Sequence, residues 1–208
     1  MSLPDIRDRE TIDAEIRKKR YIKIGIVLLV ILIPIIWYMM TYNSLITMDN
    51  GVEAKWQQVE VQYQRRMDLI PNLVNTVKGY ASFEQKVITD VTDMRSRWQT
   101  ATTREDKINA ADGLDQALGR LIAVSENYPD LKANQNFLAL QDELTNTENK
   151  IAVERQRYND AVRDYNIAIN QIPTNIVAQN LGLTKKPYFE SKKGSEEPVQ
   201  VDFNFSKS

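Results

Sequence analysis

The sequence predicts an all-α protein: an antiparallel up-and-down helical bundle of long helices on an N-terminal transmembrane helix, with a short strand-like C-terminal tail. The chain contains only 7 glycines and 7 prolines among its 208 residues. Glycine and proline together usually make up about 12% of a protein, so both are scarce here. Apolar residues recur at seven-residue steps, and one apolar stretch lacks charge. We therefore divide the chain into a basic segment 1–23, a transmembrane helix 24–42, a bundle domain 43–182 and an extended tail 183–208.

The transmembrane helix is predicted from residues 24–40, which read IGIVLLVILIPIIWYMM. These 17 residues make about 25 Å of helix, and the flanking residues extend it enough to cross a hydrocarbon core of about 30 Å. Trp37, Tyr38 and Tyr42 lie where an interfacial aromatic belt is expected. Pro34 is tolerated inside such a span. Bulky side chains occupy the place of a signal-peptide cleavage site, which favours an uncleaved anchor.

The charges that flank this span predict its orientation. Residues 1–23 hold seven basic side chains, whereas residues 41–54 hold none. The positive-inside rule therefore places the N-terminus in the cytoplasm and the bundle domain outside.

The first helices of the bundle follow directly. Two parallel rows predict a helix over 44–69: Leu45, Val52, Val59, Arg66 and Asp49, Trp56, Tyr63, Ile70. Pro71 is expected to end or restart this helix, with a short helix after it. Ser82 to Gln85 has capping-box spacing and predicts a helix to about residue 100.

The second half of the bundle is also helical by pattern. Thr103 to Asp106 predicts another helix start, and residues 127–130, NYPD, predict a break. The longest helix has apolar residues at strict heptad spacing, which is typical of coiled-coil packing. Pro173 is expected to end it. The heptad row consists of Phe137, Leu144, Ile151, Tyr158, Tyr165 and Ile172.

The tail ends in a candidate strand over 199–205, because apolar and polar residues alternate there. Its apolar members are Val199, Val201, Phe203 and Phe205. A lone strand has no partner inside a helical bundle. Either the tail packs loosely on the bundle, or it pairs with another chain by strand addition.

Charged residues on core rows point to a structural polar network. Glu148 and Arg155 lie on a second row of the long helix, and Arg66 lies on a core row of the first helix. A buried charge needs a partner, because an unpaired one costs several kcal/mol. We predict an interhelical network that joins Arg65 or Arg66 and Asp68 to Glu148 and Arg155. The alternative is that these side chains reach water at the edge of the bundle.

A second candidate site is the corner that follows the first long helix. It contains Pro71, Asn72, Asn75, Lys78, Gly79 and Tyr80. This corner is either a partner-docking site or a turn that requires this chemistry.

The composition excludes several kinds of chemistry. The chain contains no His and no Cys, which excludes disulfides, Cys-ligated zinc, a thiolate nucleophile and a Ser-His-Asp triad. With 27 basic and 28 acidic residues, its net charge of −1 argues against nucleic-acid binding. We expect no catalytic residues, no metal site and no cofactor.

Residues 65–81, RRMDLIPNLVNTVKGYA, resemble the signature of the LemA family. Residues 42–45 (YNSL) and 128–133 (YPDLKA) fit the same family, as do the following single residues: Trp56, Phe137, Glu148, Ile151, Arg155, Tyr158, Asn159, Tyr165 and Asn166. One departure is Phe83, where the family commonly has a His. The resemblance implies a single-pass bacterial membrane protein with a helical-bundle domain, and family descriptions place its N-terminus outside.

We therefore expect a non-enzymatic, single-pass protein of the bacterial plasma (inner) membrane. It would act through protein–protein contacts in the cell envelope as a homo-oligomer, with other envelope proteins as further partners. Two alternatives stay open. One is a ligand or lipid sensor that signals through the anchor, and the other is an envelope enzyme that uses carboxylates.

Overall fold

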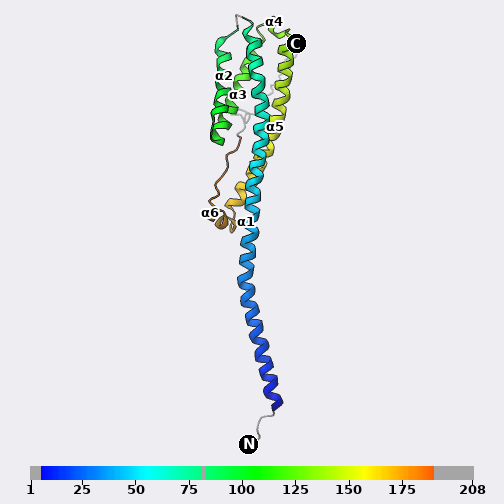
Figure 1. Cartoon of the computed structure of the whole chain (residues 1–208), viewed down its shortest axis with the longest axis vertical. Helices are drawn as coiled ribbons and strands as arrows, with labels where there is room; N and C mark the ends of the chain where they lie inside the picture. The colour runs from blue at the N-terminus through cyan, green and yellow to red at the C-terminus, as the bar shows by residue number, and fades with distance from the viewer. Residues whose placement is uncertain (1–5, 81–82, 190–208) are drawn as a thin grey trace, which may run out of the picture. The chain divides into compact units, whose positions relative to one another are not determined.

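The computed structural model describes residues 6–80 and 83–189, and 86% of the described residues are helical, with no strand among them (Figure 1). The helices are α1 (Ile6–Lys78), α2 (Gln85–Thr100), α3 (Arg104–Ser125), α4 (Pro129–Lys132), α5 (Gln135–Asn170) and α6 (Thr174–Asn180). The all-α helical-bundle prediction is confirmed. The up-and-down order of the whole bundle stays a prediction, and so does the strand at 199–205, which lies outside the described residues.

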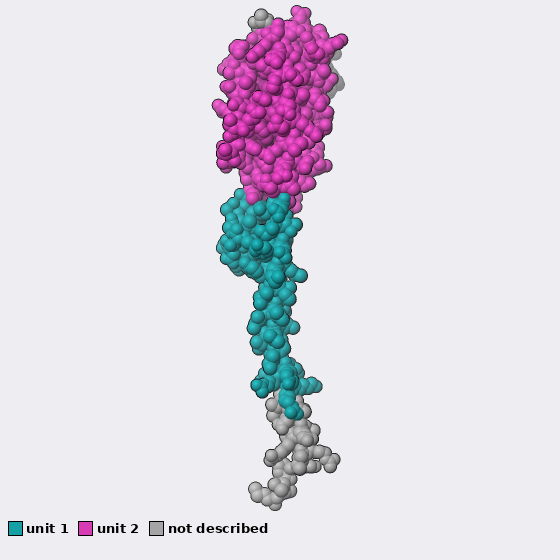
Figure 2. Space-filling model, viewed as in Figure 1, with its two compact units in different colours: residues 1–50, 165–185 teal, residues 51–164, 186–208 magenta. Residues whose placement is uncertain are grey.

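The chain forms two compact units (Figure 2). The first contains residues 1–50 and 165–185, and the second contains residues 51–164 and 186–208. In the second unit, Trp56 of α1 packs on Tyr158 of α5. Arg66 lies ten residues after Trp56, and it contacts Glu148, which lies ten residues before Tyr158. The two helices therefore run in opposite directions where they pair.

The apolar stretch of α1 behaves as the sequence predicts. Helix α1 is long and apolar enough to cross a membrane, with a mean hydropathy of 2.5 over its most apolar window. None of that window is buried inside the described structure, so its side chains lack a protein core to pack against. A membrane would supply the missing apolar environment.

The expected break at Pro71 is wrong, because α1 continues through it to Lys78. A proline lacks the N–H that would bond to the carbonyl four residues earlier, which here belongs to Met67. Arg95 of α2 supplies the missing donor, since its Nε–H donates to the Met67 carbonyl oxygen at 3.2 Å. The neighbouring helix thus satisfies the carbonyl that Pro71 leaves open.

The core follows the predicted rows closely. The two rows of α1 are buried from Leu45 to Ile70, apart from half-buried Asp49. The heptad row of α5 is buried from Phe137 to Tyr165, but its expected last member Ile172 is 84% exposed. The reason is that α5 ends at Asn170, so Ile172 leaves the helical register.

Local signals differ in how well they predict helix starts. Thr103 caps α3 as expected, since its hydroxyl accepts from the Asp106 N–H at 3.1 Å. At α2, Glu84 is the N-cap residue and makes no side-chain cap bond, and Ser82 lies outside the described residues. The short helices α4 and α6 were not expected, because segments of four and seven residues carry no periodic pattern.

Residues 186–189 are held by the bundle, although we placed them in the tail. Phe189 is buried and stacks on Trp56 with ring centres 5.8 Å apart. The Asn159 side chain donates to the Phe189 carbonyl at 2.9 Å and accepts from its N–H at 3.0 Å. The Tyr158 hydroxyl donates to the Pro187 carbonyl at 2.8 Å. The Tyr158–Asn159 pair therefore fixes the extended chain against the core.

The role of Arg95 gives a testable coupling. Arg95→Met should destabilise the bundle by about 1–3 kcal/mol, because the buried Met67 carbonyl loses its donor. In a Pro71→Ala background the backbone N–H at 71 supplies that bond, so the same substitution should cost much less. Urea unfolding in detergent, followed by circular dichroism, measures both values, with exposed Arg97→Met as the control. Equal losses in the two backgrounds would contradict this account.

Candidate functional site

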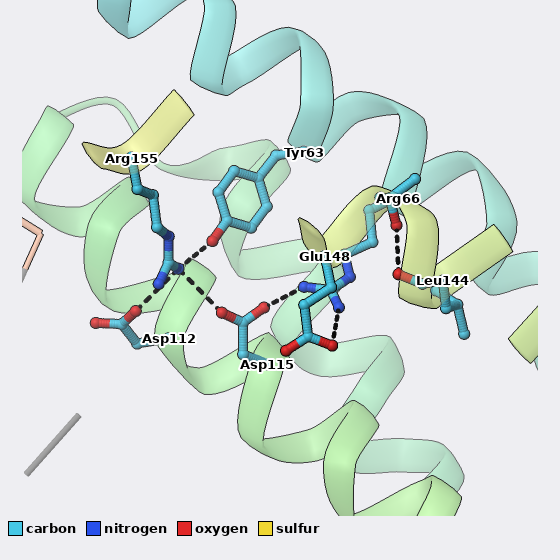
Figure 3. Close-up of polar contacts among 8 residues, drawn as sticks. Tyr63, Arg66, Asp112, Asp115, Leu144, Glu148 and Arg155 are labelled. Atoms are coloured by element: carbon cyan, nitrogen blue, oxygen red, sulfur yellow. Dashed lines mark hydrogen bonds and ion pairs between the residues drawn. The ribbon is translucent and has the colours of Figure 1, made fainter. Parts of the chain in front are cut away.

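The candidate site is a charge network, which we define as six residues on three helices (Figure 3). Helix α1 contributes Tyr63 and Arg66, α3 contributes Asp112 and Asp115, and α5 contributes Glu148 and Arg155.

Asp115 lies between the two guanidinium groups. Its Oδ1 accepts from Arg66 Nη1 at 2.5 Å, and its Oδ2 accepts from Arg155 Nη2 at 3.0 Å. The side chains of Arg66 and Asp115 are 4% and 9% exposed. One buried carboxylate thus bridges α1 and α5 through α3.

Each arginine also has a second set of partners. Arg155 donates to Asp112 Oδ1 at 3.0 Å and to the Tyr63 hydroxyl, and its guanidinium lies 4.5 Å from the centre of the Phe189 ring. Arg66 reaches Glu148 Oε2 at 3.5 Å. The Glu148 side chain is 58% exposed, so this pair contributes little compared with the buried pairs.

Burial dominates the electrostatics of the network. It raises the pKa of the Asp115 carboxyl above its usual value, while the charges of Arg155 and Arg66 oppose that rise. The pKa of the Tyr63 hydroxyl is also raised, first by burial and then by the negative charge of Asp115. Tyr63 therefore stays neutral and accepts the Arg155 hydrogen bond.

A cavity of about 250 Å³ lies beside the network. Arg66, Asp115 and Glu148 line it together with Leu118, Gly119, Ile122, Gln141, Leu144 and Thr145. The carboxylate-enzyme alternative requires a free carboxylate in such a cavity. Here Asp115 and Glu148 are both engaged by Arg66, which favours a structural role that fixes the register of three helices.

The structure brings together only part of the predicted network. Arg66 contacts Glu148, and both arginines Arg66 and Arg155 bind the same carboxylate. Arg65 and Asp68 are exposed, and Asp68 accepts from Gln64 at 2.8 Å on its own helix. Neither belongs to the network, because their positions on α1 face away from the buried row.

Asp112 and Asp115 were missed by the sequence reasoning. Ala111, Leu114, Asp115 and Leu118 follow the spacing of one helix face, so the pattern places Asp115 on the apolar side of α3. An acid at such a position is the signal that would have identified it as a buried partner for arginine.

The predicted docking corner is dispersed along the end of α1. Pro71, Asn72, Asn75 and Lys78 belong to its last turns, so no broken-helix corner forms. Asn72 and Asn75 line a cavity of about 420 Å³ with Thr76, Asn136, Ala139 and Leu140. After Gly79, the Tyr80 hydroxyl donates to the Asp130 carbonyl at 3.2 Å and accepts from Asn134 at the same distance.

Other predicted positions have structural surroundings. Phe83 is buried and packs on Tyr128 with ring centres 5.0 Å apart. Within residues 17–80 and 83–189, no group of three or more His, Cys, Asp or Glu could hold a metal ion. The proposed strand-pairing residues Val199 to Phe205 lie beyond the described chain.

Comparisons with known proteins give one family match and several relatives. The model of the LemA family matches residues 55–203. Magnetosome protein MamQ 2 of Paramagnetospirillum magneticum is 28% identical over 187 residues, covering 77% of this chain and 69% of the relative. Protein LemA of Metamycoplasma hominis is 26% identical over 161 residues, covering 77% and 73%. The family match spans most of the chain, including all six network residues.

The bridging carboxylate should matter most for stability. Asp115→Asn should cost about 3–5 kcal/mol of unfolding free energy, because buried Arg66 and partly buried Arg155 lose their shared counter-charge. Asp112→Asn should cost less than about 1 kcal/mol, since that carboxylate is 39% exposed. Urea unfolding of the full chain in detergent compares them. Similar losses for the two variants would show that Asp115 does not hold the network.

The Tyr63 hydroxyl should make stability depend on alkaline pH. Its pKa in the folded chain lies above the ordinary tyrosine value of 10.0, so the folded chain holds the proton that the unfolded chain releases. The stability that the protonated Tyr63 hydroxyl contributes is present below pH 10.0 and is lost as the pH rises further. The stability difference between wild type and Tyr63→Phe should therefore shrink between about pH 9 and 11. Exposed Tyr188→Phe is the control, and a constant difference for Tyr63→Phe would contradict the prediction.

Proposed function

The chain belongs to the LemA family, and we propose that it acts non-enzymatically as a membrane-anchored bundle that forms homo-oligomers in the bacterial cell envelope. Its membrane association is supported by the apolar stretch of α1. We further propose the plasma (inner) membrane, with a cytoplasmic N-terminus and an external bundle. The seven basic residues before the span support this orientation.

The observation that carries the proposal is that α1 and α5 each expose a valine to solvent. On α1, Val61 lies midway between Trp56 and Arg66. On α5, Val153 lies midway between Tyr158, which contacts Trp56, and Glu148, which contacts Arg66. The two valines are therefore level with each other, and each is 46% exposed. Exposed apolar side chains on long helices favour association with another helical surface.

The charge network supports the non-enzymatic part of the proposal. Its carboxylates are engaged by guanidinium groups, whereas a general base needs a carboxylate that is free to accept a proton. A second copy of this chain is the simplest partner for a helical surface, because self-complementary contacts generate closed dimers. Other envelope proteins remain further partners in this proposal.

Light scattering of the full chain in detergent tests the oligomer. The wild type should exceed the 24.0 kDa monomer after subtraction of the detergent mass. Val61→Glu combined with Val153→Glu should lower the measured mass, because two new charges would be buried at the contact. The matched control is Ser96→Glu with Gln99→Glu, which adds the same charge on exposed positions of α2.

A chain shortened by residues 199–208 separates the two proposed contacts. A loss of oligomers only in this chain would assign association to the C-terminal strand rather than to the valine pair. Monomers in the wild type and in the shortened chain would overturn the homo-oligomer proposal.

A further inference from the structure

The end of α5 and helix α6 expose large apolar side chains. Ile172 is 84% exposed and Ile176 is 57% exposed, whereas Val177 and Ala178 on the other side of α6 are buried. Helix α6 therefore buries two apolar residues against the protein and exposes Ile176 on its other side. Removing the exposed isoleucines from water would contribute about 25 cal/mol for every Å² of apolar surface buried, so an apolar cover would stabilise this surface.

The surrounding sequence lacks charge over a long distance. No residue from 165 to 184 is charged, although 26% of the whole chain is charged. Lys185 and Lys186 follow immediately. On α1, residues 24–48 are likewise uncharged. Both uncharged stretches belong to the same compact unit, which contains residues 1–50 and 165–185 (Figure 2).

A contact beside the end of the uncharged stretch of α1 places the two stretches at one level. Burial and the neighbouring Asp49 carboxylate raise the pKa of Tyr165 to about 12, so Asp49 and Tyr165 are neighbours. From Tyr165 to the end of α5 at Asn170 the helix advances about 8 Å. A similar distance along α1 from Asp49 toward the N-terminus leads to the region of Tyr42. Tyr42 is the last aromatic residue at the end of the apolar stretch.

We propose that residues 167–183, which we call the interfacial segment, lie in the lipid interface of the membrane that α1 crosses. Ile172 and Ile176 enter the boundary between headgroups and acyl chains, and α6 lies on the membrane as a short amphipathic element. Lys185 then stands where basic residues contact anionic headgroups. The lipid is the occupant, because the exposed isoleucines belong to the same compact unit as the uncharged, unburied stretch of α1.

The absence of cysteine makes the test direct, since single-cysteine variants need no background changes. The full chain carrying Ile172→Cys or Ile176→Cys is labelled with a nitroxide and reconstituted in vesicles of phosphatidylcholine and phosphatidylglycerol. Collision with oxygen, which concentrates in lipid, is compared with collision with a water-soluble nickel complex. Ile33→Cys in the apolar stretch is the lipid control. Leu138→Cys, at a 44% exposed apolar position on α5, is the control in water.

The oxygen-to-nickel collision ratio at positions 172 and 176 should be several-fold higher than at 138 and should approach the ratio at 33. A ratio equal to that at 138 would overturn the proposal. Exclusion of both reagents at 172 and 176 would also overturn it, because protein would then cover the segment. Neither result depends on the mass of the oligomer, so this proposal and the proposed function fail separately.

Discussion

Two guanidinium groups packed between helices need a negative charge within reach, and Asp115 supplies it. Arg66 on α1 and Arg155 on α5 bind opposite oxygens of that carboxylate, so α3 is fixed against both helices. A shift of any one helix by a single turn would move its group by about 5.4 Å and leave buried charges unpaired. The apolar rows around the network supply most of the stabilisation, whereas the network selects one register among several that apolar packing would tolerate.

Helix α1 also depends on a side chain from another helix, which makes up for a local defect in its own hydrogen bonding. Pro71 removes a backbone donor, and a side chain from α2 replaces it at the Met67 carbonyl. The Tyr158–Asn159 pair similarly satisfies backbone groups of an extended segment that has no strand beside it among the described residues. In each case a side chain completes backbone hydrogen bonding that regular secondary structure leaves open.

The sequence predicted the features that periodicity controls. The buried rows of α1 and α5, the start of α3 and the burial of Arg66 all follow from residue spacing. The continuity of α1 through Pro71 was not predictable, because it depends on Arg95, which is distant in sequence and belongs to another helix. Asp115 was missed because its role appears only when α1 and α5 are packed on α3. The exposure of Ile172 was missed because the heptad row continues past the residue where the helix ends.

The sharing of one carboxylate by two arginines also restricts how related sequences can diverge. Loss of Asp115 alone leaves Arg66 and Arg155 without the carboxylate that they share, and such an intermediate is less stable than the complete set. Replacement of the whole set by well-packed apolar residues is often neutral or stabilising. Arg66, Asp115 and Arg155 should therefore be inherited or lost together, and a relative that keeps only one of them should carry a new compensating charge nearby.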